Sequence, residues 1–213
     1  ITKNNMNKAI IIAAALTIGC SQTQAQGNVK NIGKNNITLN SKLMTPEALW
    51  AMGRIAGAQA SPDGKNIVYQ VGYYSVKENR GHQVLYIMPA DGRENKLLTT
   101  DAKSETDAVW IEGGKRIAFL REGQIWAMNP DGTGRQQLTH DKTGIDGFKF
   151  SPDGQSVILI KQIPYNVTIQ KNPADLPKTT GMVITDMNYR HWDEYVTSIP
   201  HPFLAAVTAN GIG

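Results

Sequence analysis

Along most of the chain, short runs of alternating apolar and polar residues are separated by turns rich in Pro, Asp and Gly. Two of these turns read Ser-Pro-Asp-Gly, at residues 61–64 and 151–154. Proline presets the second position of a type I turn, aspartate accepts the third, and glycine supplies the left-handed conformation that follows. The pattern therefore predicts β-hairpins whose second strands begin with residues 65–70 and 155–160.

The hairpins belong to a longer repeat. Asp91-Gly92 recurs 40 positions later as Asp131-Gly132, and Leu98-Thr99 recurs at the same distance as Leu138-Thr139. In the middle copy, residues 112–114 (Glu-Gly-Gly) replace the Pro-Asp-Gly turn. A period of about 40 residues with only strand and turn signals is typical of propeller blades. The sequence predicts an all-β fold, a partial β-propeller of about three four-stranded antiparallel blades with a fourth begun.

A short helix is expected at the start of the propeller, which occupies residues 45–213. Thr45 can cap this helix, Pro46 suits its first position, and Glu47 favours the positive end of the helix dipole. The expected apolar stripe consists of Leu49, Met52 and Ile55, flanked by Trp50.

The repeat is interrupted in the last third of the chain, where an insertion is expected at about residues 163–200. Its first part, residues 163–181, contains three prolines and no strand alternation. The elements expected after it are a strand at 182–185, a helix at 186–196, a strand at 203–207 and a turn at 209–211. We expect no return strand after that turn, and an open blade edge invites aggregation. The pattern therefore indicates a propeller that continues in a longer protein.

The N-terminus is interpreted as a targeting segment. Residues 1–25 are expected to be a signal peptide, with residues 1–5 translated from upstream of the first methionine. Lys8 gives a basic start, residues 9–18 are apolar but too short to span a bilayer, and small residues at 23–25 suit cleavage.

An alternative interpretation makes the chain a bacterial lipoprotein. The chain would then be cut between Gly19 and Cys20, and Cys20 would carry the lipid and anchor the protein to a membrane. The residues before Cys20 fit that pattern imperfectly, which favours ordinary cleavage. We expect an exported protein, periplasmic or secreted, with residues 26–44 as a polar linker before the propeller.

Charge narrows the range of partners. The formal net charge is +4 at pH 7, and it falls to +2 once Lys3 and Lys8 of the leader are left out. Because no basic run or stripe is present, nucleic-acid binding is not expected. His82 and His140 fall in expected turn regions, where they would be solvated.

Four stretches of the chain resemble the N-terminal propeller of the prolyl oligopeptidase family of serine peptidases, and most closely its dipeptide-releasing bacterial branch. These stretches are residues 45–71, 128–139, 150–161 and 184–204. The last is the most specific, because it lies outside the generic repeat. The resemblance implies a complete propeller that screens short peptides on their way to a C-terminal α/β-hydrolase domain with a Ser-Asp-His triad.

The chain departs from that family pattern in one respect. None of its eight serines lies in a Gly-x-Ser-x-Gly elbow, so no catalytic residue is assigned. The resemblance implies that propeller carboxylates bind the substrate's free amino terminus, and Asp193 and Glu194 are the candidates, with Trp192 as a pocket wall. A plain structural role for these residues is the competing interpretation. No cofactor or metal is expected, since His191, Asp193 and His201 lack a recognisable ligand spacing.

Three hypotheses about function remain open at this point. The first is the start of an exported, dipeptide-releasing serine peptidase, whose partners are short peptides and its own C-terminal domain. The second is a non-enzymatic periplasmic binding propeller of the Tol type, which shares the Ser-Pro-Asp-Gly repeats. The third and least favoured is a complete four-bladed protein that ends at Gly213.

Overall fold

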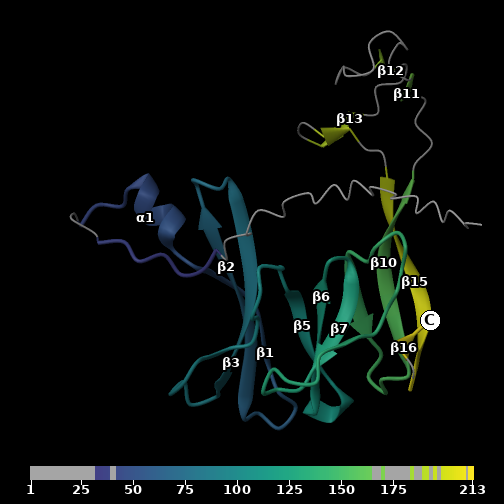
Figure 1. Ribbon diagram of the computed structural model, residues 1–213. Helices are drawn as coiled ribbons and strands as arrows, with labels where there is room; N and C mark the ends of the chain where they lie inside the picture. Colours follow the sequence, from purple (N-terminus) through teal and green to yellow (C-terminus); the bar gives the residue numbers. More distant parts are fainter. Residues whose placement is uncertain are drawn as a thin grey trace, which may run out of the picture.

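Three four-stranded antiparallel sheets make up most of the described chain and stand side by side as the blades of a partial β-propeller (Figure 1). The computed structural model describes residues 32–38, 42–164, 169–170, 183–184, 189–191, 194–195, 198–209 and 211–213. The proposed signal peptide with Cys20 lies outside these residues. Among the helices of the described ranges, none is long and apolar enough to cross a membrane.

Within each blade, neighbouring strands are consecutive along the chain, except that β15 lies next to β10 in blade 3. Blade 1 consists of β1 (Arg54–Ala60), β2 (Asn66–Ser75), β3 (Arg80–Pro89) and β4 (Lys96–Leu97). Blade 2 consists of β5 (Thr106–Ile111), β6 (Arg116–Arg121), β7 (Gln124–Met128) and β8 (Gln136–Gln137). Blade 3 consists of β9 (Gly147–Phe150), β10 (Ser156–Pro164), β15 (Ser198–Thr208) and β16 (Gly211–Ile212). The four-stranded blade expected from the repeat is confirmed.

The two Ser-Pro-Asp-Gly turns have the same internal bonding. The Ser61 hydroxyl donates to Asp63 Oδ1 (2.5 Å), and the same carboxylate oxygen accepts from the backbone N–H of Lys65 (3.1 Å). Ser151 and Asp153 repeat both contacts in blade 3. The following glycines have φ near +70°, a conformation that only glycine adopts without strain. The motif therefore builds hairpins, as the sequence predicts.

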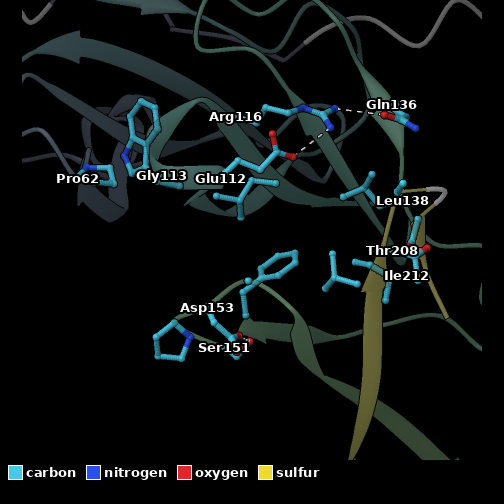
Figure 2. A pocket seen from close by; sticks show the side chains of 18 residues that line it. Pro62, Glu112, Gly113, Arg116, Gln136, Leu138, Ser151, Asp153, Thr208 and Ile212 are labelled. Carbon is cyan, nitrogen blue, oxygen red and sulfur yellow. Dashed lines mark hydrogen bonds and ion pairs between the residues drawn. The ribbon is translucent and has the colours of Figure 1, made fainter.

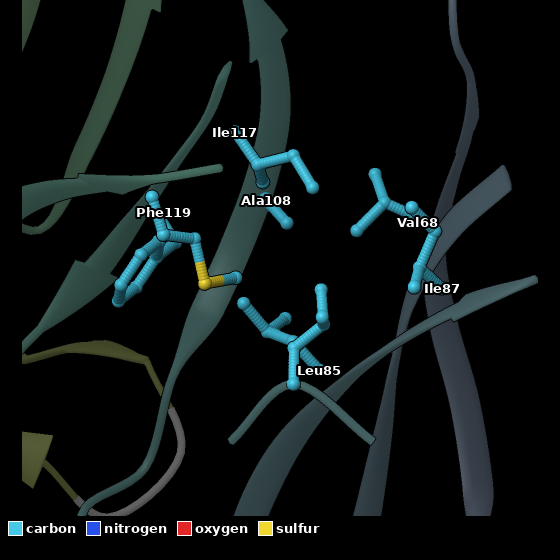
Figure 3. Close-up of a cluster of buried hydrophobic side chains, with 8 residues drawn as sticks. Val68, Leu85, Ile87, Ala108, Ile117 and Phe119 are labelled. Atoms are coloured by element: carbon cyan, nitrogen blue, oxygen red, sulfur yellow. The ribbon is translucent and has the colours of Figure 1, made fainter. Parts of the chain in front are cut away.

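Apolar side chains fill the space between neighbouring blades. Between blades 1 and 2, Val68 and Leu85 face Ile117 and Phe119, and all four are fully buried (Figure 3). A second cluster joins blades 2 and 3, where Val157 is fully buried. Burying each such side chain contributes roughly 1.5–3 kcal/mol. The blades are thus held together mainly by these faces.

The Leu-Thr repeat ends each of the first two blades in the same way. Leu98 and Leu138 donate their N–H groups to the carbonyls of Leu85 and Ile125, at 2.8 Å each. Each leucine is followed by a threonine whose hydroxyl accepts a backbone N–H at 2.9 Å. Thr99 accepts the N–H of Leu85, and Thr139 accepts that of Ile125. The threonine hydroxyl thereby satisfies a buried backbone donor where the outer strand stops.

Helix α1 (Pro46–Ala51) begins as expected but is shorter than the sequence suggests. The Thr45 hydroxyl accepts the N–H of Ala48 at 3.2 Å and caps the helix. The expected stripe is wrong: Ala48 is the buried residue, while Leu49, Met52 and Ile55 are exposed. The helix ends before the stripe is complete, since Ile55 already belongs to β1.

Two further expectations about the last third of the chain are wrong. Residues 186–196 were expected to form a helix, but β13 (Tyr189–His191) pairs there with β14 (Glu194–Tyr195). The return strand expected to be missing after residues 209–211 is present as β16, which completes blade 3. Strand β12 (Val183–Ile184) pairs with β11 (Ile169–Gln170). These four short strands are inserted between β10 and β15.

Candidate functional site

The two ends of the blades differ in chemistry. We call the end with the β4–β5 and β6–β7 connections the loop end, and the end with the Ser-Pro-Asp-Gly turns the turn end. The β10–β15 connection, which carries the inserted strands, leaves the propeller at the loop end. Each end has its own candidate site.

A buried carboxylate organises the loop end between blades 1 and 2. Glu105 is fully buried, and its oxygens accept hydrogen bonds from Arg121 (3.1 Å), Arg135 and the Thr99 hydroxyl (2.7 Å). Arg135 also donates to the carbonyl of Leu98 at 2.8 Å. A buried charge is tolerated only when it is paired and hydrogen-bonded, and both conditions are met here. The cluster joins the two blades, and its arginines are paired with the carboxylate of Glu105.

A second ion pair recurs in blade 3 with the 40-residue period. Asp101 pairs with Arg121 at 2.7 Å, and Asp141 pairs with Lys161 at 2.9 Å. Hydrogen bonds from the Thr143 side chain and then from Lys161 lower the pKa of Asp141 to about 2. Each pair ties the loop that precedes a blade to the second strand of that blade.

The second ion pair lies at the base of an arm. Strands β10 and β15 stay paired from Ser156–Ala206 to Pro164–Ser198, whereas β9 accompanies β10 only from Val157 to Ile160. Beyond that point Lys161 lies over the ring of Phe203, 4.4 Å from its centroid. Gln162 donates to Asp146 Oδ2 at 2.8 Å and anchors the arm to the preceding loop. This arm carries the insertion that contains Trp192, Asp193 and Glu194.

The turn end holds a cavity of about 590 Å³ between blades 2 and 3 (Figure 2). Its apolar wall includes Trp110, Leu138, Phe150 and Ile212. At the rim, Arg116 makes only long contacts, 3.6 Å to Glu112 and 3.5 Å to Gln136. Because the lining also includes the polar side chains of Glu112, Arg116, Gln136 and Asp153, a hollow of this size suits a small ligand with both apolar and polar groups, or a side chain of another segment.

The cavity does not have the serine–histidine pair of a serine hydrolase. Ser151 lines it, but its hydroxyl donates to Asp153 (2.5 Å) and accepts the N–H of Ser156 (3.0 Å). The hydrogen bond from the Ser151 hydroxyl, and then the one from the backbone N–H of Gln155, lower the pKa of Asp153 and keep it ionised. Activation of a serine needs an adjacent base, and no histidine lines this cavity.

Among the histidines whose side chains are described, His82 has a structural role. His82 was expected to be solvated, but it lies on β3 and is buried, which corrects that expectation. Its ring nitrogens lie 2.7 Å from the carbonyl oxygen of Ile32 and 3.3 Å from that of Lys103. His140 is exposed, as expected. In the described part of the chain, no group of three or more His, Cys, Asp or Glu residues could hold a metal ion.

The structure does not place the candidate substrate-binding residues. Trp192 and Asp193 lie outside the described residues, and Glu194 is described only as part of β14. Sequence reasoning missed the Glu105 cluster and the packing of Ile32, because both depend on contacts between distant segments. The spacing of Asp101 and Asp141, 40 positions apart like Arg121 and Lys161, was the available signal for the repeated ion pair.

Comparison with known proteins gives close relatives. No protein-family model matches the chain. The chain is 40% identical over 180 residues to dipeptidyl-peptidase 5 of Porphyromonas endodontalis, a match that covers 82% of this chain and 26% of that protein. It is 39% identical over 209 residues to dipeptidyl-peptidase 5 of Porphyromonas gingivalis, covering 95% of this chain and 29% of that protein. The chain thus spans less than a third of the length of these relatives.

Solved structures include an acylaminoacyl peptidase from Pyrococcus horikoshii, with a TM-score of 0.43 and 15% identity over 55% of this chain and 18% of that one. The curated matches confirm the resemblance to the dipeptide-releasing branch of the prolyl oligopeptidase family that the sequence motifs indicated.

Proposed function

We propose that this chain, a relative of dipeptidyl-peptidase 5, is the N-terminal propeller portion of an exported serine peptidase that releases dipeptides from short peptides. The observation that carries the proposal is the 40% identity over 180 residues, which covers 82% of this chain. Catalysis is assigned to an α/β-hydrolase domain elsewhere in the longer protein. The propeller acts as a filter, because its blades are packed face to face and admit only extended or short substrates.

The described residues support this division of labour. At the turn end, the Ser151 hydroxyl is hydrogen-bonded within its own turn, and at the loop end Arg121 and Arg135 both pair with Glu105. Neither place offers an activated nucleophile. A scaffold that carries the substrate-contacting insertion on a fixed arm is consistent with both observations.

The test compares this 213-residue chain with the product of its complete reading frame. We expect the longer protein to release the fluorophore from dipeptidyl-aminomethylcoumarin substrates and to be inactivated by a serine-directed fluorophosphonate. This chain alone should do neither. The longer protein should also cleave a free octapeptide but leave the same sequence intact inside a folded protein. A reading frame without a Gly-x-Ser-x-Gly elbow, and no release, would leave the Tol-type binding propeller as the function.

The same protein tests the role proposed for the insertion. Asp193→Asn and Glu194→Gln should each raise KM for substrates with a free amino terminus by about tenfold or more, since a hydrogen bond between charged groups is lost. The value of kcat should change little. Truncation of Trp192 to Ala should raise KM less. Glu94→Gln, at an exposed position in the β3–β4 turn, is the control and should behave like the parent. Unchanged KM in both carboxylate variants would assign these residues a purely structural role.

A further inference from the structure

The cavity between blades 2 and 3 lies at a place where the blade repeat changes. At the corresponding place between blades 1 and 2, the connection from β7 to β8 consists of residues 129–135. Lys96, the first residue of β4, donates to the carbonyl of Asp131 in this connection at 2.7 Å. A Cβ at Gly132 would lie 3.5 Å from the side chain of Leu98, which is 1% exposed. The connection therefore closes the seam between blades 1 and 2.

Between blades 2 and 3 the corresponding connection is short. Strands β15 and β16 are joined by residues 209 and 210 alone. Gln136 occupies the position of Lys96 in the repeat, 40 residues later, and lines the cavity. Leu138 likewise occupies the position of Leu98, but it lines the cavity and is only partly buried. The hollow of about 590 Å³ is thus the space that the longer connection fills in the neighbouring seam.

A charged residue stands at the rim of this cavity, at a position where the other blades have none. Arg116 is the first residue of β6, while Asn66 and Ser156 begin the equivalent strands, β2 and β10. In the described part of the chain, the two contacts of the Arg116 guanidinium are long, 3.6 Å to Glu112 and 3.5 Å to Gln136. A guanidinium carries five N–H donors, and hydrogen bonds from nitrogen to oxygen normally measure about 2.7–3.2 Å. Arg116 therefore has donors left for a ligand in the cavity that it lines.

The two carboxylates that line the cavity leave this guanidinium available. The Glu112 side chain is 53% exposed, and an exposed pair at 3.6 Å is weak, so another carboxylate can replace it. Asp153 lies across the cavity from Arg116 (Figure 2). One oxygen of Asp153 already accepts the Ser151 hydroxyl and the N–H of Gln155. The blade 2 side of the cavity therefore offers a cation beside an apolar wall.

We propose that this cavity binds a ligand in which a carboxylate is joined to an aromatic or branched aliphatic body. Arg116 pairs with the carboxylate through two parallel N–H donors, the geometry in which these two groups match. Trp110, Leu138 and Phe150 enclose the apolar body. Two sources present this chemistry: the C-terminal residue of a peptide and a free carboxylic acid. The inference does not depend on the proposed function, since every group that it uses belongs to the described residues of blades 2 and 3.

Binding is measured by titration calorimetry on the product of the complete reading frame. The probes are N-acetylphenylalanine, which represents a peptide C-terminus, and phenylbutyrate, which represents a free acid. We expect at least one of the two acids to bind saturably, and its neutral amide to bind about tenfold more weakly or worse, because the charged pair is lost. Binding of N-acetylphenylalanine alone would assign the site to peptide ends, and binding of phenylbutyrate alone would assign it to free acids. Either result supports the proposal.

Four variants place the binding in the cavity. Arg116→Gln should weaken binding of the acid by about tenfold or more and leave that of the amide unchanged. Leu138→Trp fills the hollow but keeps the charge, so it should weaken binding of both. Glu112→Gln should strengthen binding of the acid, because it removes the competing carboxylate, and a general loss of structure cannot imitate that gain. Arg93→Gln, in an exposed turn, is the control and should bind like the parent.

Three results would overturn the proposal. The first is that neither acid binds. The second is binding that is unchanged in both Arg116→Gln and Leu138→Trp, which would place the acid elsewhere on the protein. The third is tighter binding of phenylbutylamine than of phenylbutyrate, which would show that the cavity selects a cation. Dipeptide release plays no part in these measurements, so failure of the proposed function would leave their outcome unaffected.

Discussion

At the scale of single residues, the structure shows which contacts determine the role of a given side chain. Aspartate in the Ser-Pro-Asp-Gly turns binds the serine hydroxyl and a backbone N–H, so Asp63 and Asp153 are structural and not ligands. Such a role can be inferred from sequence, because all the contacts lie within six residues. Gly53 has a requirement that no local pattern reveals, since it depends on Val71 and Tyr73 of β2.

Gly53→Ala is therefore expected to destabilise the chain by roughly 1–3 kcal/mol, the usual cost of overpacking. The added Cβ would lie 2.8–2.9 Å from the side chains of Val71 and Tyr73, which must shift. Urea denaturation followed by tryptophan fluorescence measures the loss. Gly33→Ala is the matched control, because a Cβ there meets nothing within 4 Å. Equal stability of the two variants would contradict the proposed close packing.

At the scale of elements, the strands follow from alternation and turns, but the type of the inserted elements does not. Residues 186–196 carry aromatic and charged residues at spacings that fit a short helix or a hairpin. Tyr189 and Tyr195 pair across β13 and β14 in the structure, and aromatic residues favour strands. Thr185 and Asp186 could cap a helix there as Thr45 does at α1, so capping residues do not distinguish the two sites, and the cross-strand pairing decides.

The Leu-Thr ends of the blades make a second prediction. Thr99→Val should cost about 1–3 kcal/mol of folding free energy, because the buried N–H of Leu85 and the Glu105 carboxylate both lose the hydroxyl. The neighbouring Thr100→Val substitution, at an exposed position, should be close to neutral. Thermal unfolding of both variants measures the difference. Similar stability of the two would mean that the threonine hydroxyl is not what ends the blade.

The repeated ion pair makes a prediction about pH. The pKa of Asp141 is lowered to about 2 from the usual value of 3.8, so its carboxylate stabilises the fold above about pH 4. This contribution is lost as the pH falls from about 4 to 2, since the group then takes up a proton in the folded state as well. The stability gap between the parent chain and Asp141→Asn should therefore be constant at neutral pH and narrow below pH 4.

Chemical denaturation at a series of pH values measures that gap. Asp91→Asn serves as control, because Asp91 forms its ion pair with Arg93 in an exposed turn, where such pairs contribute little. The two variants should differ from each other at pH 7 and converge at pH 2. A gap for Asp141→Asn that stays the same from pH 7 to pH 2 would exclude the ion pair as its source.

At the scale of the whole molecule, blades are added in sequence and each contributes one face to the next. The fully buried set of Val68, Leu85, Ile117 and Phe119 shows what such an interface looks like when both blades are present. On the opposite face of blade 1, Ile67 pairs with Met88 and Tyr69 with Tyr86, and these four side chains are only partly buried. Among the described residues, blade 1 therefore meets another blade on one face only.

The sequence by itself determined the blade repeat, the hairpin turns, the capped start of α1 and the resemblance to a peptidase propeller. These features depend on contacts within a few residues or on a period that can be counted along the chain. Only the tertiary structure decided that His82 is buried, that Ile32 packs on blade 1, and that Glu105 joins two arginines. In each case the deciding contacts join segments 16 to 50 residues apart, and no local pattern records which distant group will satisfy a buried polar atom.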